Sequence, residues 1–156
     1  MTSPVTTSQV LMGKFFSCLT VFFFMMILTV SFNIIMDIYS KGRLDWGPVL
    51  SGYLGTFLLG TSIIAIGMFF SSLSENQIVA AALTFMFVFS LWLLIFTANY
   101  IAYPMNHFLV YLSLSHHLNS FADGYIGIKH IFYYFSMTSF WLFATGLSVE
   151  SARWRQ

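Results

Sequence analysis

Four long stretches without a charged side chain divide this sequence and constrain its fold more than any other feature. Six Lys and Arg and five Asp and Glu are placed so that residues 15–36, 46–74, 76–122 and 130–149 carry none of them. A helix needs about 20 apolar residues to cross a hydrocarbon core of about 30 Å, because each residue adds about 1.5 Å. Each stretch is therefore long enough for one membrane crossing.

The composition agrees with a membrane environment. Only 7% of the 156 residues are charged and 58% are hydrophobic, whereas a soluble domain carries about 25% charged residues. This hydrophobicity excludes a disordered chain, and a net charge of +1 without a basic face excludes a nucleic-acid partner. The lipid bilayer is the expected partner. The single Cys18 excludes an internal disulfide and a cysteine-built metal site.

We predict an all-α, polytopic helical bundle that forms one transmembrane domain over residues 1–156. The third uncharged stretch holds one crossing, because Pro104 and a run of Ser, His and Asn interrupt its second half. That half, residues 105–124, is expected to form short re-entrant or interfacial helices. The first span exceeds the 7 to 15 residues typical of a signal-peptide core, so we expect it to stay in the membrane. The four predicted spans are Phe15 to Met36, Val49 to Phe70, Ile78 to Asn99, and His130 to Val149.

Positive charge alone does not orient the bundle. An even number of spans places both termini on one side, and the positive-inside rule then compares the two sets of flanking Lys and Arg. The count is three against three: Lys14, Arg153 and Arg155 on the side of the termini, and Lys41, Arg43 and Lys129 on the other.

Small residues mark one face of the second span. At 100° per residue, four of them lie within an arc of about 80°, with a fifth close by. Such a stripe lets a neighbouring helix approach closely, and we assign it to helix packing without chemistry. The residues are Gly52, Thr56, Gly60 and Gly67, with Gly55 beside them.

Two polar features flank the spans. Near the end of the first span, Asn33 and Asp37 are one turn apart, and a position at headgroup level is favoured over a conduit. After the second span, Ser74 is predicted to cap the next helix, with Gln77 completing a capping box. Glu75 would then lie in the first helical turn, where the helix dipole favours negative charge.

The sequence contains no recognisable catalytic or cofactor motif. A P-loop, H-E-x-x-H, G-x-S-x-G and a Cys pair are all missing, so we predict no enzyme, no catalytic residue and no cofactor in this chain. Four histidines are the one constellation that a haem or a metal might use. Adjacent ones point in different directions on a helix, so hydrated or hydrogen-bonded rings are favoured and no metal ligand is assigned. They are His107, His116, His117 and His130.

A series of motifs resembles the ABC-2 type permeases, closest to their gliding-motility-associated and copper-processing-associated subfamily. The series begins with residues 2–14, which are similar to the stretch that opens the third transmembrane helix in that family. Further matches follow in order along nearly the whole chain. They are Asp45 to Pro48, Gly52 to Gly55, Gly67 with Ser71 to Gln77, Ser113 with His116, Phe121 with Gly124, Tyr133 with Tyr134, and Arg153 with Trp154.

The resemblance implies a transport subunit in the inner or plasma membrane, with both termini in the cytoplasm. Such a permease has six spans, pairs with a second permease subunit and docks on a separate ATPase subunit, which holds ATP and Mg²⁺. Residues 2–9 and 71–77 would be cytoplasmic, whereas Asp45 and residues 105–124 would lie outside. Because the family's first two spans are missing, we expect a fragment of a longer permease or a start assigned too late.

The resemblance also suggests site residues. The candidate ATPase contact is Thr2, Ser3, Pro4, Val5, Gln9, Ser74, Glu75 and Asn76. The candidate extracellular gate is His116, Phe121 and Gly124. Two other functions remain open from the residues themselves: a haem- or metal-binding electron-transfer subunit, based on the four histidines, and a membrane assembly protein that transports nothing.

Overall fold

The chain folds into helices only, over the part that the structure describes. The computed structural model describes residues 6–98, 100–101 and 105–153, and these hold six helices and no strand. The predicted all-α class is therefore confirmed. The helices are α1 (Thr7–Tyr39), α2 (Trp46–Leu73), α3 (Gln77–Ala98), α4 (Met105–Leu112), α5 (Leu114–Ala122) and α6 (Ile128–Arg153).

Three of the described helices, α1, α2 and α3, are long and apolar enough to cross a membrane, with mean hydropathies of 2.3, 1.8 and 2.5 in their best windows. They contain the first three predicted spans, apart from Asn99, which lies outside the described residues. Helix α6 covers the fourth predicted span, at 26 residues, but it is not among the three. Tyr, Ser and Thr side chains such as Tyr133, Tyr134 and Thr138 make it more polar than the others.

Polar side chains fix where the long helices begin. The side-chain oxygen of Gln9 accepts a bond from the Thr6 amide at 3.1 Å, and an oxygen of Asp45 accepts one from Gly47 N at 3.0 Å. Asn76 caps α3, because its Oδ1 accepts from Ile78 N at 2.9 Å.

The predicted Ser74 cap is therefore wrong. Helix α3 begins at Gln77, so Ser74 and Glu75 precede it, and Glu75 is not in its first turn. The Ser74 hydroxyl instead accepts a bond from Asn76 N at 3.2 Å. Both residue types are good caps, and here the asparagine takes the position next to the helix.

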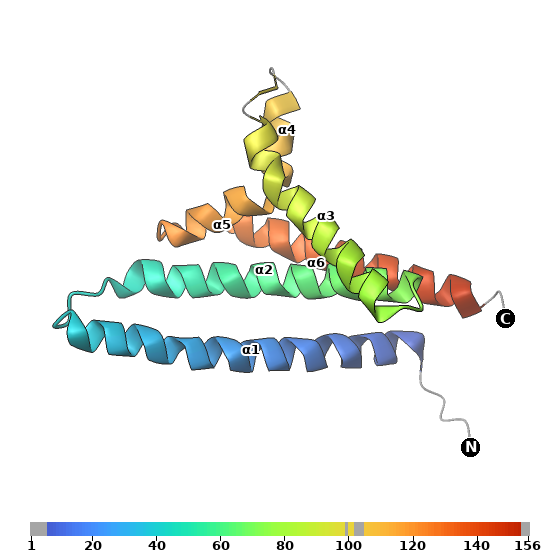
Figure 1. Ribbon diagram of the computed structural model, residues 1–156, viewed down its shortest axis with the longest axis horizontal. Helices are drawn as coiled ribbons and strands as arrows, with labels where there is room; N and C mark the ends of the chain where they lie inside the picture. Colours follow the sequence, from blue (N-terminus) through green and yellow to red (C-terminus); the bar gives the residue numbers. More distant parts are fainter. Residues whose placement is uncertain (1–5, 99, 102–104, 154–156) are drawn as a thin grey trace.

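The two connections that flank α2 lie at opposite ends of the molecule (Figure 1). Helices α1 and α2 lie side by side and antiparallel, α6 runs along α2, and α3 runs obliquely to them. The start of α1, the α2–α3 connection and the end of α6 share one end of the molecule. The α1–α2 connection and the turn between α5 and α6 lie at the other end, where Gly124 packs against Pro48.

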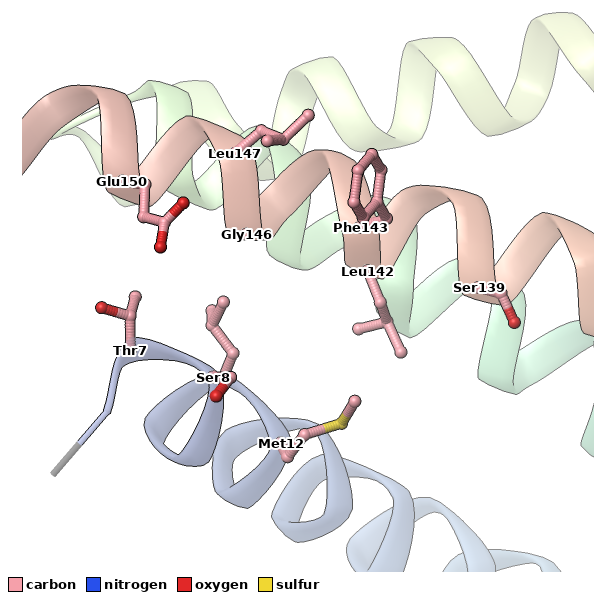
Figure 2. A pocket seen from close by; sticks show the side chains of 10 residues that line it. Thr7, Ser8, Met12, Ser139, Leu142, Phe143, Gly146, Leu147 and Glu150 are labelled. Atoms are coloured by element: carbon pink, nitrogen blue, oxygen red, sulfur yellow. The ribbon is translucent and has the colours of Figure 1, made fainter.

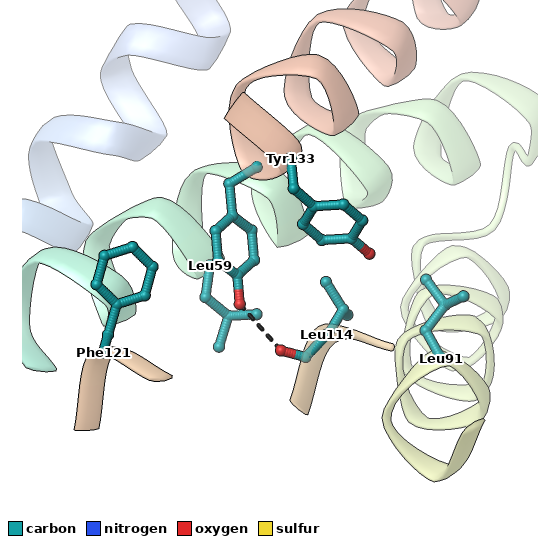
Figure 3. Close-up of a cluster of buried hydrophobic side chains, with 6 residues drawn as sticks. Leu59, Leu91, Leu114, Phe121 and Tyr133 are labelled. Atoms are coloured by element: carbon teal, nitrogen blue, oxygen red, sulfur yellow. Dashed lines mark hydrogen bonds between the residues drawn. The ribbon is translucent and has the colours of Figure 1, made fainter. Parts of the chain in front are cut away.

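The core is built around α2. One buried cluster joins α2 to α3, α5 and α6, and its members are Leu59, Leu91, Leu114, Phe121, Tyr133 and Tyr134 (Figure 3). A second cluster, of Phe15, Ala65 and Met68, joins α2 to α1. Within their most apolar windows, 39% of α2 is buried, against 6% of α1 and 11% of α3. The apolar surfaces of α1 and α3 therefore face outward, as expected of helices in contact with lipid.

Candidate functional site at the break between α4 and α5

The chain breaks its helix at Ser113, between α4 and α5, and the neighbouring carbonyl groups are bonded by side chains. The last carbonyls of a helix have no partner within it, which is costly in apolar surroundings. Here Tyr111 O accepts a bond from His117 Nε2 at 2.9 Å, and Leu112 O accepts one from the Tyr133 hydroxyl at 2.7 Å. On the other side of the break, Leu114 O accepts from the Tyr134 hydroxyl at 3.0 Å, the dashed line in Figure 3. The two tyrosine bonds attach the broken pair to α6, and the histidine bond joins α5 to α4.

The hydrogen bonds also define the tautomers of two buried histidines. His117 Nδ1 lies 2.6 Å from His130 Nδ1, and each residue is only 1% exposed. Because the Tyr111 carbonyl can only accept, His117 Nε2 carries the proton and its Nδ1 is an acceptor when the ring is neutral. His130 Nδ1 must then donate. A continuous relay therefore runs from His130 of α6 through His117 of α5 to the end of α4.

Burial keeps the His117 ring neutral. The pKa of His117 is lowered from 6.5 to about 4, chiefly by loss of hydration, and the nearby His130, His116 and Lys129 act in the same direction. Only the bond to the Tyr111 carbonyl acts in the opposite direction. The ring also stacks on Tyr133, with centroids 3.9 Å apart and planes 11° from parallel. At neutral pH this site is an uncharged relay.

The structure brings together three of the four histidines singled out in the sequence, His116, His117 and His130. The ring of His117 lies 5.4 Å from that of His116 and 4.9 Å from that of His130, and His116 and His130 are 6.1 Å apart. The 2.6 Å contact between the two Nδ1 atoms is a hydrogen-bond distance, whereas two nitrogens on one tetrahedral zinc would be about 3.3 Å apart. Among the described residues, no group of three or more His, Cys, Asp and Glu is arranged to hold a metal.

The candidate gate residues lie in α5 or directly after it. Phe121 is fully buried against Gly55 of α2, so its ring fastens α5 to α2. His116 is half-buried. Gly124 has a φ of +83°, a conformation that side chains disfavour, and it ends the broken pair beside Pro48.

The small residues of α2 meet three different helices rather than one. Gly55 faces Phe121 of α5, Gly60 faces Phe22 of α1, and Gly67 faces Thr84 of α3. A side chain at Gly52 would meet nothing within 4 Å. Thr56 is exposed, and its hydroxyl donates to the Gly52 carbonyl. Gly55, Gly60 and Gly67 therefore let three different helices approach α2 closely.

The structure describes only part of the candidate ATPase contact. Thr2, Ser3, Pro4 and Val5 lie outside the described residues, whereas Gln9, Glu75 and Asn76 are exposed and Ser74 is half-buried. Gln9 belongs to the first turns of α1 and residues 74–76 connect α2 to α3, and these two segments share one end of the molecule. A pocket of about 410 Å³ opens there between α1 and α6, where Thr7, Ser8 and Met12 of α1 face Glu150 and Leu142 of α6 (Figure 2).

Sequence reasoning missed the relay of His117, His130 and the two tyrosines. One signal was present: Tyr133 and Tyr134 are polar residues inside a predicted span, where hydroxyls need partners. The partner carbonyls become visible only after α5 folds back onto α6. The chain matches no family model, no curated protein and no solved structure.

Proposed function

We propose that the chain is a membrane-spanning permease subunit of the ABC-2 type, which moves its substrate with energy from ATP hydrolysis in a separate ATPase subunit. The observation that carries the proposal is the division of the molecule into two ends. The start of α1, the α2–α3 connection and the end of α6 gather at one end, whereas α5 extends toward the other and α4 stands beside the end of α3. The ordered motifs that resemble ABC-2 permeases favour the same division.

A fourth span formed by α6 is part of this proposal. Its 26 residues extend about 39 Å, which exceeds the hydrocarbon core. Its two tyrosine hydroxyls donate to α4 and α5, and two of its threonine hydroxyls donate to its own backbone, Thr138 to Tyr134 O at 2.8 Å and Thr145 to Trp141 O at 2.7 Å. Hydroxyls satisfied in this way are tolerated in the bilayer. With four spans, both termini lie in the cytoplasm of a cell whose plasma or inner membrane holds the protein.

The proposed mechanism transmits motion through α2. ATP binding in the partner moves the cytoplasmic end, which includes the α2–α3 connection at Glu75. Because Phe121 packs against Gly55, a shift of α2 is transmitted to the broken pair at the outer end. A second permease subunit completes the path. Such coupling requires contacts that differ between the two states of the transporter.

We expect Glu75→Lys to reduce co-purifying ATPase activity about tenfold. Glu75 is exposed at the proposed cytoplasmic end, and a reversed charge at a protein interface costs affinity. The full-length protein is purified from its host in mild detergent, and vanadate-sensitive ATP hydrolysis is measured. Asp123→Lys makes the same charge change at the opposite end and should have no effect. Equal losses in the two variants, or no ATPase activity with the unmodified protein, would refute the proposed function.

Cysteine labelling tests the four spans. In a Cys18→Ser background, we expect Arg43→Cys and Lys129→Cys to react with a membrane-impermeant maleimide in intact cells. Glu75→Cys and Ser151→Cys should react only after lysis. All four positions are exposed in the structure, so a failure to react in intact cells reports their side of the membrane. If Lys129→Cys and Ser151→Cys reacted from the same side, α6 would not cross.

A further inference from the structure

A second pocket, between α1 and α2, combines a polar group of side chains with apolar walls. Its volume is about 680 Å³, within the range of small-molecule sites, and Ala122 of α5 also borders it. Its polar lining consists of Thr29 and Asn33 from α1 with Tyr53 and Thr56 from α2. No Lys, Arg, Asp or Glu is among the residues that line it.

The hydrogen bonds at this pocket leave little ambiguity about donors. The Thr29 hydroxyl donates to Met26 O at 2.7 Å, so its oxygen accepts the proton of the Tyr53 hydroxyl at 3.0 Å. The Tyr53 oxygen in turn accepts from Asn33 Nδ2 at 2.7 Å. Both hydroxyl protons in this group, those of Thr29 and Tyr53, are therefore already donated in hydrogen bonds.

One strong acceptor remains. Asn33 Nδ2 also donates to Thr29 O at 3.4 Å, and because a carbonyl only accepts, this contact fixes the orientation of the amide. Asn33 Oδ1 is then left without a hydrogen-bond partner among the described residues. On α2, the Thr56 proton is given to Gly52 O at 2.9 Å, which leaves another oxygen that can only accept. The pocket thus suits a ligand that donates a hydrogen bond and carries no charge.

The α1 side of the pocket changes from polar at one end to apolar at the other. Asn33 lies near the end of α1 that joins the α1–α2 connection, whereas Phe22 is eleven residues earlier, about 16 Å deeper at 1.5 Å per residue. Met25 and Met26 lie between them, and their flexible side chains adapt to apolar ligands. A molecule with a polar end near the membrane surface and an apolar chain toward the midplane matches this order.

We propose that this pocket binds a neutral lipid with a free hydroxyl, of the diacylglycerol class. The hydroxyl donates to Asn33 Oδ1, and one acyl chain follows Phe22, Met25 and Met26. A phospholipid fits less well, because no cation in the lining would pair with its phosphate. Tyr53 holds Asn33 in place and is a positioning residue. The inference does not depend on the partner ATPase and concerns a different part of the molecule.

Photolabelling of the full chain in phosphatidylcholine vesicles tests the site. The probes are a diacylglycerol with a diazirine in one acyl chain and its O-methyl ether, which has no hydroxyl proton. We expect the alcohol to label peptides of α1 and α2 about five- to tenfold more than the ether, as one hydrogen bond allows. Equal labelling by both probes, or equally strong labelling by a phosphatidylcholine probe, would overturn the proposal. So would crosslinking of a second copy of the chain through these positions in place of lipid.

Variants provide an independent measurement. Asn33→Leu should reduce labelling by the alcohol to the level of the ether, with helicity by circular dichroism unchanged. Asn119→Leu makes the same substitution at an exposed position on α5 and should label as the unmodified protein does. An Asn33→Leu variant that folds and still discriminates between the two probes would also overturn the proposal. The probe comparison on the unmodified chain decides the question even if the variant misfolds.

Discussion

His117→Ala is expected to lower the free energy of unfolding by about 2–6 kcal/mol, the largest effect we predict. The substitution leaves the part-buried Tyr111 carbonyl and the buried His130 Nδ1 proton without partners, at about 1–3 kcal/mol for each group that stays away from water. Unfolding in mixed micelles with increasing dodecyl sulfate, followed by circular dichroism, measures the change. His116→Ala is the matched control, because His116 is half-buried and its ring is not part of the relay. Equal losses in the two variants would contradict the relay.

The same residue makes stability depend on pH. The pKa of His117 is about 4 in the folded protein and 6.5 as its ordinary value, so the folded state binds fewer protons between these values. Its contribution is fully present above about pH 6.5 and is lost as pH falls toward 4. A proton on Nδ1 would also face the proton of His130 Nδ1. The stability curve should therefore drop over this window.

The test compares the unmodified protein with a variant that lacks the His117 ring. His117→Gln keeps an amide donor and acceptor but cannot be protonated there. The groups that face the ring, His116, His130, Tyr111, Tyr133 and Lys129, are unchanged in this variant. Its stability should fall less between pH 6.5 and 4 than that of the unmodified protein. Parallel curves would show that His117 does not titrate as described.

Gly55→Ala is expected to cost about 1–3 kcal/mol of stability, the second large effect. An added Cβ would lie 2.6 Å from the Cβ of Phe121 and 2.7 Å from its ring, which is fully buried and has no space to move. Gly52→Ala makes the same change three residues away, where nothing lies within 4 Å. That control should leave stability unchanged or raise it by up to about 1 kcal/mol, because alanine favours helix. Both are measured by the micelle unfolding described above.

A double variant identifies the cause. If Phe121 is the obstacle, Phe121→Gly, which removes the Cβ at 2.6 Å as well as the ring, should remove most of the penalty of Gly55→Ala, so the two effects are not additive. Additive effects would mean that the alanine acts elsewhere, for example on the helix itself. Gly67→Ala offers an intermediate case, because its nearest neighbour is Thr84 Cγ2 at an ordinary 3.7 Å. We expect little change there.

The sequence predicts the long helices well because length and hydropathy are properties of consecutive residues. The uncharged stretches correspond to α1, α2, α3 and α6, and the interrupted stretch corresponds to α4 and α5. The cap of α3 was predicted at Ser74 and lies at Asn76, because two good capping residues stand within three positions and local pattern does not choose between them.

The relay could not be predicted in the same way. His117 and His130 are thirteen residues apart on different helices, and only the turn between α5 and α6 brings their rings together. Phe121 and Gly55 are further apart still. Such contacts depend on tertiary folding, which a single sequence does not encode in any local spacing. The composition of the region, rich in His, Ser and Tyr among apolar residues, nevertheless marks it as a place where polar groups must find partners.

The bonds at the α4–α5 break have a consequence for biosynthesis. Two of the three carbonyl groups there receive their protons from Tyr133 and Tyr134, which leave the ribosome after the whole of α4 and α5. Until then, the Leu112 carbonyl at the end of α4 needs water, so we expect the broken pair to remain at the membrane surface during translation. Once α6 has been synthesised, the broken pair can move into apolar surroundings. The insertion of α6 therefore determines when α4 and α5 reach their final position.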